Sequence, residues 1–256
     1  MEIERDELYY EIKGSGTPIL CLSGFASTGY NYHSLKLNGK MIILDNRGMG
    51  KSPNSLNSYS IQTLAQDACE LMLSLGYKKF HVCGISMGGF IATECALLFP
   101  ELVKSLSLLC TTSGGDDFVT LPYSTADDMF RFYSQDNKKI SEALADITVH
   151  NEKLKNSIAN IRQQYSPADP FEVVKQKKAV DTYLSHSHPL EKIKCPTYIL
   201  TGDNDRYVNP ENSLILSKKI KNSKADLISE ADHMFFLEKP EEVSLKVSTF
   251  IEGVES

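Results

Sequence analysis

The segment Gly84-Ile85-Ser86-Met87-Gly88 places a serine between two glycines, with an apolar run before it and a helix-like segment after it. Residues 80–83 are typical of the end of a buried strand, and residues 90–99 continue at helical spacing as far as Pro100. We therefore expect Ser86 on a sharp strand-to-helix turn. Such a turn strains the serine backbone, needs glycines where strand and helix approach, and pushes the hydroxyl outward. The pentapeptide alone also fits a glycine-rich turn with a surface serine.

An acidic group follows a second strand-like segment at residues 193–202, which is rich in β-branched and aromatic residues. This segment runs into Asp203-Asn204-Asp205. A carboxylate just beyond the carboxyl end of a parallel strand lies on the face where ligands bind. The spacing from Gly202 favours Asp205, with Asp203 as the rival. The alternative is that both carboxylates only shape a turn.

His233 lies in a loop between a strand candidate at residues 225–229 and a C-terminal helix whose first turn contains Pro240. A serine hydroxyl is a poor nucleophile at neutral pH, so it needs a histidine base, and a carboxylate holds the imidazole in the correct tautomer. Ser86, Asp205 and His233 are therefore the predicted catalytic residues. The remaining histidines lack such a setting and are interpreted as surface or packing residues: His33, His81, His150, His186 and His188.

A tetrahedral oxyanion also needs backbone donors. One is expected to be the amide of Met87, and the other the amide of Phe25, in the loop after an apolar strand at residues 18–22. A further strand leads into an Asp-x-Arg-Gly-x-Gly-x-Ser turn, in which we expect Asp45 and Arg47 to pair and make the loop rigid.

Four motifs occur in a fixed order along the chain: Ser23-Gly24-Phe25, then Asp45 to Ser52, then Gly84 to Gly89, and finally Gly202-x-x-Asp205 with His233. Together they resemble the α/β-hydrolase superfamily, in its small single-domain serine esterase and 3-oxoadipate enol-lactonase branch. The resemblance covers nearly the whole chain apart from its middle. It implies a mostly parallel, eight-stranded sheet flanked by helices, and it is specific for fold and triad but not for substrate.

Three positions refine this resemblance. The first motif usually begins with histidine, where this chain has Ser23, so the support of the oxyanion loop is expected to differ. Phe90 stands where the related menaquinone synthase usually carries arginine, which argues against that activity. Ser86 replaces the aspartate that haloalkane dehalogenases and epoxide hydrolases use, and a serine suits acyl transfer.

The middle of the chain departs from the alternation of strands and helices. Residues 1–113 and 190–256 are predicted to form the hydrolase core, and residues 114–189 a helical cap, with amphipathic stretches at 127–132, 138–149, 151–165 and 171–184. Aromatic and methionine side chains here could line an acyl pocket, although such a stripe also fits plain core. The pocket candidates are Phe118, Met129, Phe130, Phe132, Tyr133 and Phe235.

Composition favours a soluble enzyme. The net charge of −6 gives no basic footprint, so neither nucleic acid nor anionic membrane is expected as a partner. The six cysteines form no C-x-x-C pair, so no metal site is predicted. We find no signal peptide and no apolar run of about 18 residues, which predicts a cytoplasmic protein. No sequence feature indicates an oligomeric state.

The predicted function is a serine hydrolase that cleaves a small to medium carboxylic ester or lactone through an acyl-enzyme, without metal or organic cofactor. An enol-lactonase and a carrier-protein methyl esterase are alternatives. A non-catalytic ligand receptor of the same fold is the alternative from another class, and steady ester turnover distinguishes it from an enzyme.

Overall fold

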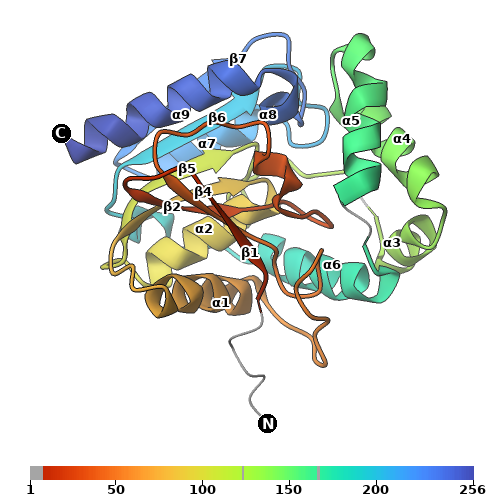
Figure 1. Cartoon of the computed structure of the whole chain (residues 1–256), viewed down its shortest axis with the longest axis horizontal. Coiled ribbons are helices and arrows are strands. Elements are labelled where there is room, and N and C mark those ends of the chain that lie inside the picture. Colours follow the sequence, from red (N-terminus) through yellow and green to blue (C-terminus); the bar gives the residue numbers. More distant parts are fainter. Residues whose placement is uncertain (1–7, 123, 166–167) are drawn as a thin grey trace.

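A seven-stranded sheet forms the centre of the computed structural model, which describes residues 8–122, 124–165 and 168–256 (Figure 1). The strands lie in the spatial order β1-β3-β2-β4-β5-β6-β7, and every neighbouring pair is parallel except β1 with β3. Their bounds are β1 Tyr10–Lys13, β2 Pro18–Leu22, β3 Lys40–Leu44, β4 Phe80–Ile85, β5 Val103–Leu109, β6 Thr197–Gly202 and β7 Ser223–Ile228. The predicted mostly parallel sheet is confirmed. The resemblance implied eight strands, and the described residues form seven.

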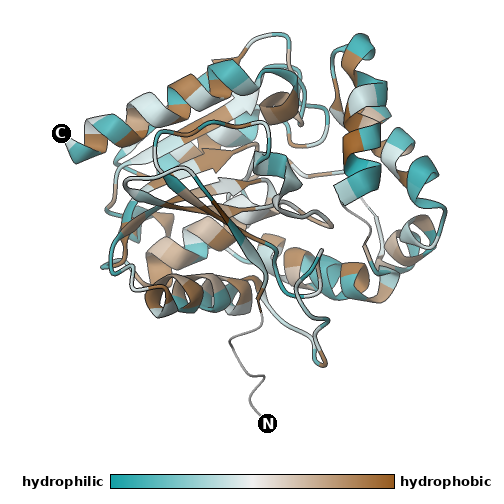
Figure 2. Ribbon diagram, in the orientation of Figure 1, coloured by the Kyte–Doolittle hydropathy of each residue, from teal (hydrophilic) through white to brown (hydrophobic). Residues whose placement is uncertain are grey.

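The central strands are buried along their whole length. Every residue of β4 and of β6 is buried, as expected where helices cover both faces of a parallel sheet. Figure 2 shows the hydrophobic colouring concentrated on the sheet and on the helices packed against it, while α9 is hydrophobic on one side only. The loops that carry Ser86 and Asp205 leave the carboxyl ends of these two buried strands.

Helices α1, α2 and α7 share one hydrophobic core with the sheet, and α8 and α9 share the core on the other face. Helix α1 begins after Ser60, because Ser60 and Thr63 cap each other: the Thr63 amide donates to Ser60 Oγ over 3.1 Å, and the Ser60 amide donates to Thr63 Oγ1 over 3.3 Å. The bounds of these helices are α1 Ile61–Ser74, α2 Met87–Leu98, α7 Glu211–Lys219, α8 Phe235–Glu238 and α9 Pro240–Glu255.

Four helices lie between β5 and β6, where amphipathic stretches were predicted, and they stand together at one side of the sheet (Figure 1). They are α3 Ala126–Tyr133, α4 Asn137–Thr148, α5 Glu152–Tyr165 and α6 Pro170–Leu184. They contact loops that leave the carboxyl ends of strands. Thr28, after β2, donates through Oγ1 to the Tyr165 carbonyl over 2.9 Å, and Arg206, after β6, donates to the Val149 carbonyl over 3.1 Å.

The predicted pair between Asp45 and Arg47 is wrong. Arg47 instead forms a bidentate pair with Asp67 of α1, with both N···O distances at 2.6 Å. Asp45 accepts from the amides of Gly29 (2.7 Å) and Lys51 (3.1 Å). The planar guanidinium of Arg47 matches the two oxygens of a carboxylate on the neighbouring helix. The Asp45 carboxylate instead accepts hydrogen bonds from backbone amides that would otherwise lack a partner.

Candidate active site

Ser86 occupies a strained turn between β4 and α2. Its φ is +54° and its ψ is −118°, a conformation that a residue with a side chain rarely adopts. The flanking glycines are required by contact, since a Cβ on Gly84 would lie 2.2 Å from the Gly88 carbonyl oxygen, and one on Gly88 would lie 2.1 Å from that of Leu22. The structure thus places Ser86 on the sharp turn that the sequence predicted.

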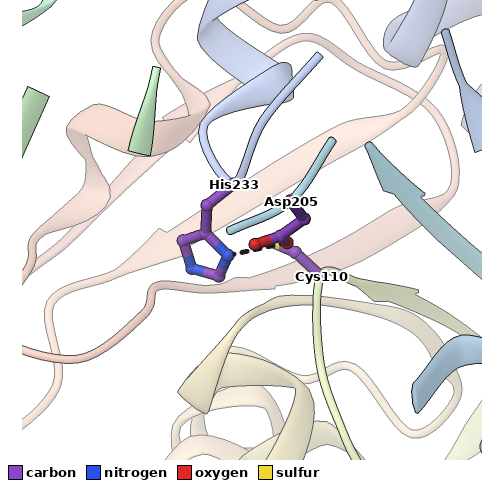
Figure 3. A group of neighbouring side chains, drawn as sticks. All are labelled: Cys110, Asp205 and His233. Carbon is purple, nitrogen blue, oxygen red and sulfur yellow. Dashed lines mark hydrogen bonds and ion pairs between the residues drawn. The ribbon is translucent and has the colours of Figure 1, made fainter. Parts of the chain in front are cut away.

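His233 and Asp205 come together beside Ser86, from the loops that follow β7 and β6. His233 Nδ1 lies 2.9 Å from Asp205 Oδ2, and His233 Nε2 lies 3.2 Å from Ser86 Oγ. An ionised carboxylate only accepts, so the hydrogen on Nδ1 points to Asp205 and leaves Nε2 to accept from the serine hydroxyl. Figure 3 shows the His233–Asp205 contact, with Cys110 close to both.

The structure also separates the two rival carboxylates. The second oxygen of Asp205, Oδ1, accepts from the amides of Tyr207 (2.9 Å) and Val208 (2.7 Å), which fixes its orientation. Asp203 is exposed and accepts from the Ala231 amide over 3.3 Å, as a turn residue does. The geometry therefore puts Asp205, and not Asp203, against His233.

A second ion pair joins the loops that carry Asp205 and His233. Arg206 Nε donates to Asp232 Oδ2 over 2.5 Å, and the Arg206 amide donates to Oδ1 of the same carboxylate over 2.9 Å. The His233 amide also donates to Asp232, over 2.7 Å. Since each partner is a chain neighbour of a predicted catalytic residue, this pair holds the two loops at a fixed separation. Sequence reasoning missed it, although the adjacent Asp-Arg and Asp-His dipeptides were a usable signal.

Burial and the neighbouring side chains act in opposite directions on His233. Burial disfavours the imidazolium, but Asp205 and Cys110 together outweigh burial and hold the pKa of His233 well above its ordinary value. Burial raises the pKa of the Cys110 thiol, so Cys110 contributes a neutral side chain.

Cys110, Asp205 and His233 present ligand atoms within 4.8 Å of one another, the arrangement drawn in Figure 3. A metal ion there would need a thiolate and a free imidazole nitrogen. The thiol is held neutral, and both nitrogens of His233 already face Asp205 and Ser86. The group therefore fits proton transfer with Ser86 better than it fits metal binding.

The predicted oxyanion loop lies against the serine. A Cβ on Gly24 would be 3.3 Å from Ser86 Cβ, and Phe25 lines the same cavity as Ser86. Ser23, which replaces the usual histidine, is fully buried and donates to the Thr28 carbonyl over 2.7 Å, so its side chain supports the loop. Met87 is the first residue of α2, where helix amides have no intrahelical acceptor.

A cavity of about 260 Å³ opens beside Ser86 and His233. Of the predicted pocket residues, Met129, Phe132 and Tyr133 line it. The other three are not among the described residues that line this cavity. Phe130 packs against Phe171, with ring centroids 5.1 Å apart. Phe235 is fully buried in the core, where Phe236 and Met234 face the cavity instead, and Phe118 borders a separate hollow.

Two polar side chains of the inserted helices also reach this site, and sequence reasoning missed both. Arg162 lines the cavity, and Gln176 Oε1 accepts from the Ala26 amide over 2.7 Å. Each lies on the buried stripe of its helix, at helical spacing from Ile158 in α5 and from Val173 in α6. A polar residue on the apolar face of a helix was the sequence signal that could have identified both.

The family profile of the alpha/beta hydrolase fold matches residues 17–240. Because this match covers well over half of the 256 residues, the chain belongs to the α/β-hydrolase fold family. The resemblance and the fold class predicted from the sequence are thereby confirmed.

The curated relatives of the chain include hydrolases of different kinds. It is 34% identical over 117 residues to RutD of Azorhizobium caulinodans, named as a candidate carbamate hydrolase, in a match that covers 44% of each protein. The match thus spans less than half the length of that relative. The chain is 28% identical over 265 residues to the monoacylglycerol lipase ABHD6 of Bos taurus, covering 95% of this chain and 77% of that protein.

Solved structures share the fold. A thermophilic esterase from Thermogutta terrifontis, with malate bound, superposes with a TM-score of 0.83 at 24% sequence identity, covering 97% of this chain and 94% of that one. Across the described residues, none of the helices combines the length and apolar content needed to cross a bilayer.

Proposed function

We propose that this protein is a serine hydrolase that cleaves a carboxylic ester or lactone of a small to medium acyl substrate. The observation that carries the proposal is the contact of His233 with both Ser86 Oγ (3.2 Å) and Asp205 Oδ2 (2.9 Å), at a serine with φ of +54°. The strained turn presents the hydroxyl, and the ring can accept its proton. Hydrolase relatives, among them an esterase and a monoacylglycerol lipase, support the same reaction class.

In the proposed mechanism, Ser86 Oγ attacks the carbonyl carbon while its proton passes to His233 Nε2. The carbonyl electron pair moves onto oxygen, which the amides of Phe25 and Met87 stabilise. Collapse breaks the bond to the leaving oxygen, which takes the proton from His233. Water then attacks the acyl-enzyme by the same sequence, and Asp205 stabilises the imidazolium throughout. These steps involve no metal or organic cofactor.

We further propose that helices α3 to α6, within residues 114–189, act as a cap that sets substrate specificity. Helices α3, α4 and α5 contribute lining residues to the cavity that contains Ser86. Most of the lining side chains are apolar, which suits the hydrocarbon part of an acyl group. Enol-lactone and carrier-protein methyl ester hydrolysis remain within this proposed class.

The test is Ser86→Ala, with Ser105→Ala as the matched control at a serine inside β5. Ser86→Ala is expected to lower p-nitrophenyl butanoate turnover by several orders of magnitude without unfolding the protein. Steady turnover in the parent distinguishes an enzyme from a receptor of the same fold. Equal turnover in parent and Ser86→Ala protein would refute the mechanism.

A further inference from the structure

Arg162 of helix α5 is a buried guanidinium at the proposed active site. Its side chain is 3% exposed, and it lines the same cavity as Ser86 and His233. Its Nη2 donates to the Ala26 carbonyl over 3.3 Å and to Tyr133 Oη over 3.4 Å, both uncharged groups. A strongly basic side chain is thus held inside a largely apolar cavity.

No carboxylate among the described residues forms an ion pair with Arg162, and its Nε has no hydrogen-bond partner there. Other cations near the site are paired: Arg206 with Asp232 at 2.5 Å, and Lys177 with Asp181 at 2.6 Å. Arg162 is different because it is buried and no carboxylate among the described residues pairs with it.

A buried charge is unfavourable unless it is paired, and a buried ionisable group usually becomes neutral instead. Arginine does not become neutral, since it remains protonated in proteins. Here burial disfavours the charged form, but the oxygens of Tyr133 and Tyr30 outweigh it, and the pKa of Arg162 stays above its ordinary value. Because no carboxylate of the described residues supplies the anion, a ligand in the cavity is the source that we consider.

Tyr30 provides a second unpartnered donor at the same cavity. It is 1% exposed, it lines the cavity, and its hydroxyl has no hydrogen-bond partner among the described residues. The guanidinium and the phenol together offer N–H and O–H donors, the set that a carboxylate accepts in paired hydrogen bonds. Arg162 Nε and Tyr30 Oη are both shielded from solvent.

We propose that Arg162, with Tyr30, binds a free carboxylate on the substrate, so that the hydrolysed ester or lactone is one whose acyl part also carries a carboxylate. This inference rests on the proposed function and narrows its substrate class. The location fits an acyl substituent, because Arg162 contacts Ala26, the residue after the proposed oxyanion donor Phe25. Adjacent residues are about 3.8 Å apart along the chain, so the carbonyl bound near Phe25 and the carboxylate bound by Arg162 would lie close together. A short carbon chain is therefore expected between the reacting carbonyl and the free carboxylate of the substrate.

The experiment compares charged and neutral esters of equal chain length. Turnover of the monoethyl esters of succinic, glutaric and adipic acids is measured against ethyl butanoate, pentanoate and hexanoate. The parent is expected to favour at least one anionic ester by about 10- to 100-fold in kcat/KM. Arg162→Met is expected to remove that preference, Arg162→Lys to retain part of it, and Tyr30→Phe to reduce it by about three- to tenfold. Because each ratio is taken within one variant, a loss of folded protein cancels.

Arg131→Met is the matched control, because Arg131 lies on an exposed position of α3. It is expected to leave the ratio of anionic to neutral turnover unchanged. A parent that prefers every neutral ester would overturn the inference, as would Arg162→Met protein that keeps the full anionic preference.

Binding to Ser86→Ala protein separates this inference from the proposed function. By calorimetry, this variant is expected to bind the preferred monoethyl ester at least about tenfold more tightly than its neutral counterpart, and Ser86→Ala/Arg162→Met protein to bind both equally. Equal affinities in Ser86→Ala protein would refute the carboxylate site even if Ser86 is the nucleophile. Unequal affinities with undiminished turnover in Ser86→Ala would refute the nucleophile and leave the carboxylate site standing.

Discussion

Strand β4 has a serine–histidine–carboxylate group at each end. At its amino end, His81 Nδ1 lies 2.7 Å from Ser105 Oγ, and His81 Nε2 lies 2.8 Å from Glu255 Oε1. Beyond its carboxyl end, His233 makes the corresponding contacts with Ser86 and Asp205, at 3.2 and 2.9 Å. The two groups contain the same chemical types at similar distances, so residue composition and spacing do not distinguish them.

The backbone and the cavity do distinguish them. Ser105 is fully buried inside β5, whereas Ser86 is partly exposed, has a φ of +54° and lines a cavity with His233. Ser86 is also followed by a helix N-terminus and faced by the Gly24-Phe25 loop, which can supply oxyanion donors. The comparison teaches that the strained turn and its surroundings, more than the three side chains, define a site for acyl transfer.

The largest expected effect comes from exchanging the carboxylate at the Ser86 group for its amide. Asp205→Asn is expected to leave the fold intact and lower ester turnover by up to about 10⁴, because the amide favours the wrong imidazole tautomer and cannot stabilise the imidazolium. Steady-state kinetics on purified protein measure the loss. Asp203→Asn is the control, with near-parental turnover expected, and a large loss there instead would move the orienting role to Asp203.

The next effect concerns the loop that faces Ser86. A methyl group at Gly24 would lie 3.3 Å from Ser86 Cβ and 3.8 Å from Ser86 Oγ. Gly24→Ala is therefore expected to displace the nucleophile relative to the loop and lower kcat by about 10- to 100-fold. Ser23→Ala, which only loses the bond to Thr28, is expected to lower kcat less than tenfold. A larger loss for Ser23→Ala than for Gly24→Ala would show that the serine side chain takes part directly.

Much of this site could be predicted because its signals are local. The glycines around Ser86 are required by contacts within one turn, and the spacing from Gly202 selected Asp205 over Asp203. Long-range partners could not be read in this way. Arg47 pairs with Asp67, twenty residues further on, and that choice depends on how α1 packs.

Only some of the predicted pocket residues line the cavity, for a similar reason. Periodicity marks a helix face as apolar but does not say which neighbour it meets, so Phe132 reached the cavity while Phe130 reached Phe171. In the same way, Phe236 faces the cavity while Phe235 is buried in the core. The sequence predicts that an apolar face exists, and the packing of the inserted helices decides what it covers.

A smaller effect concerns pH, because the two histidines shift in opposite directions. Burial lowers the pKa of His81 despite Glu255, and Asp205 raises that of His233. Hydrolysis needs a neutral His233, so kcat/KM is expected to rise with pH through a midpoint above the ordinary histidine pKa of 6.5. Measured on the residual activity of Asp205→Asn, the midpoint is expected to move towards acid. A parental midpoint below 6.5 would contradict this assignment.

The same shifts give a stability signature. Protonated His233 stabilises the fold below about pH 6.5, and this contribution is lost as pH rises through its raised folded-state pKa. His81 acts in the other direction, since its lowered pKa makes protonation unfavourable in the folded state, and stability falls as pH drops below 6.5. Urea denaturation of His81→Gln and His233→Gln proteins across this range separates the two contributions, and slopes of the same sign would contradict them.

The smallest expected effect is at the second group. Glu255→Gln matches Asp205→Asn in chemistry, but Glu255 is partly exposed and also pairs with Lys104 at the surface. We expect turnover within about twofold of the parent and a loss of less than about 1 kcal/mol in the free energy of unfolding. Kinetics and urea denaturation measure both. A loss of turnover comparable to that of Asp205→Asn would mean that the amino end of β4 contributes to catalysis.

The most direct test is covalent labelling of the two serines in one sample. A fluorophosphonate reacts with an activated serine, so peptide mass spectrometry on the labelled protein reports which hydroxyl is nucleophilic. The proposed site predicts stoichiometric modification of Ser86, none of Ser105, and loss of labelling in His233→Ala protein. Labelling of Ser105, or an unlabelled Ser86 in folded protein that still hydrolyses esters, would contradict the central claim.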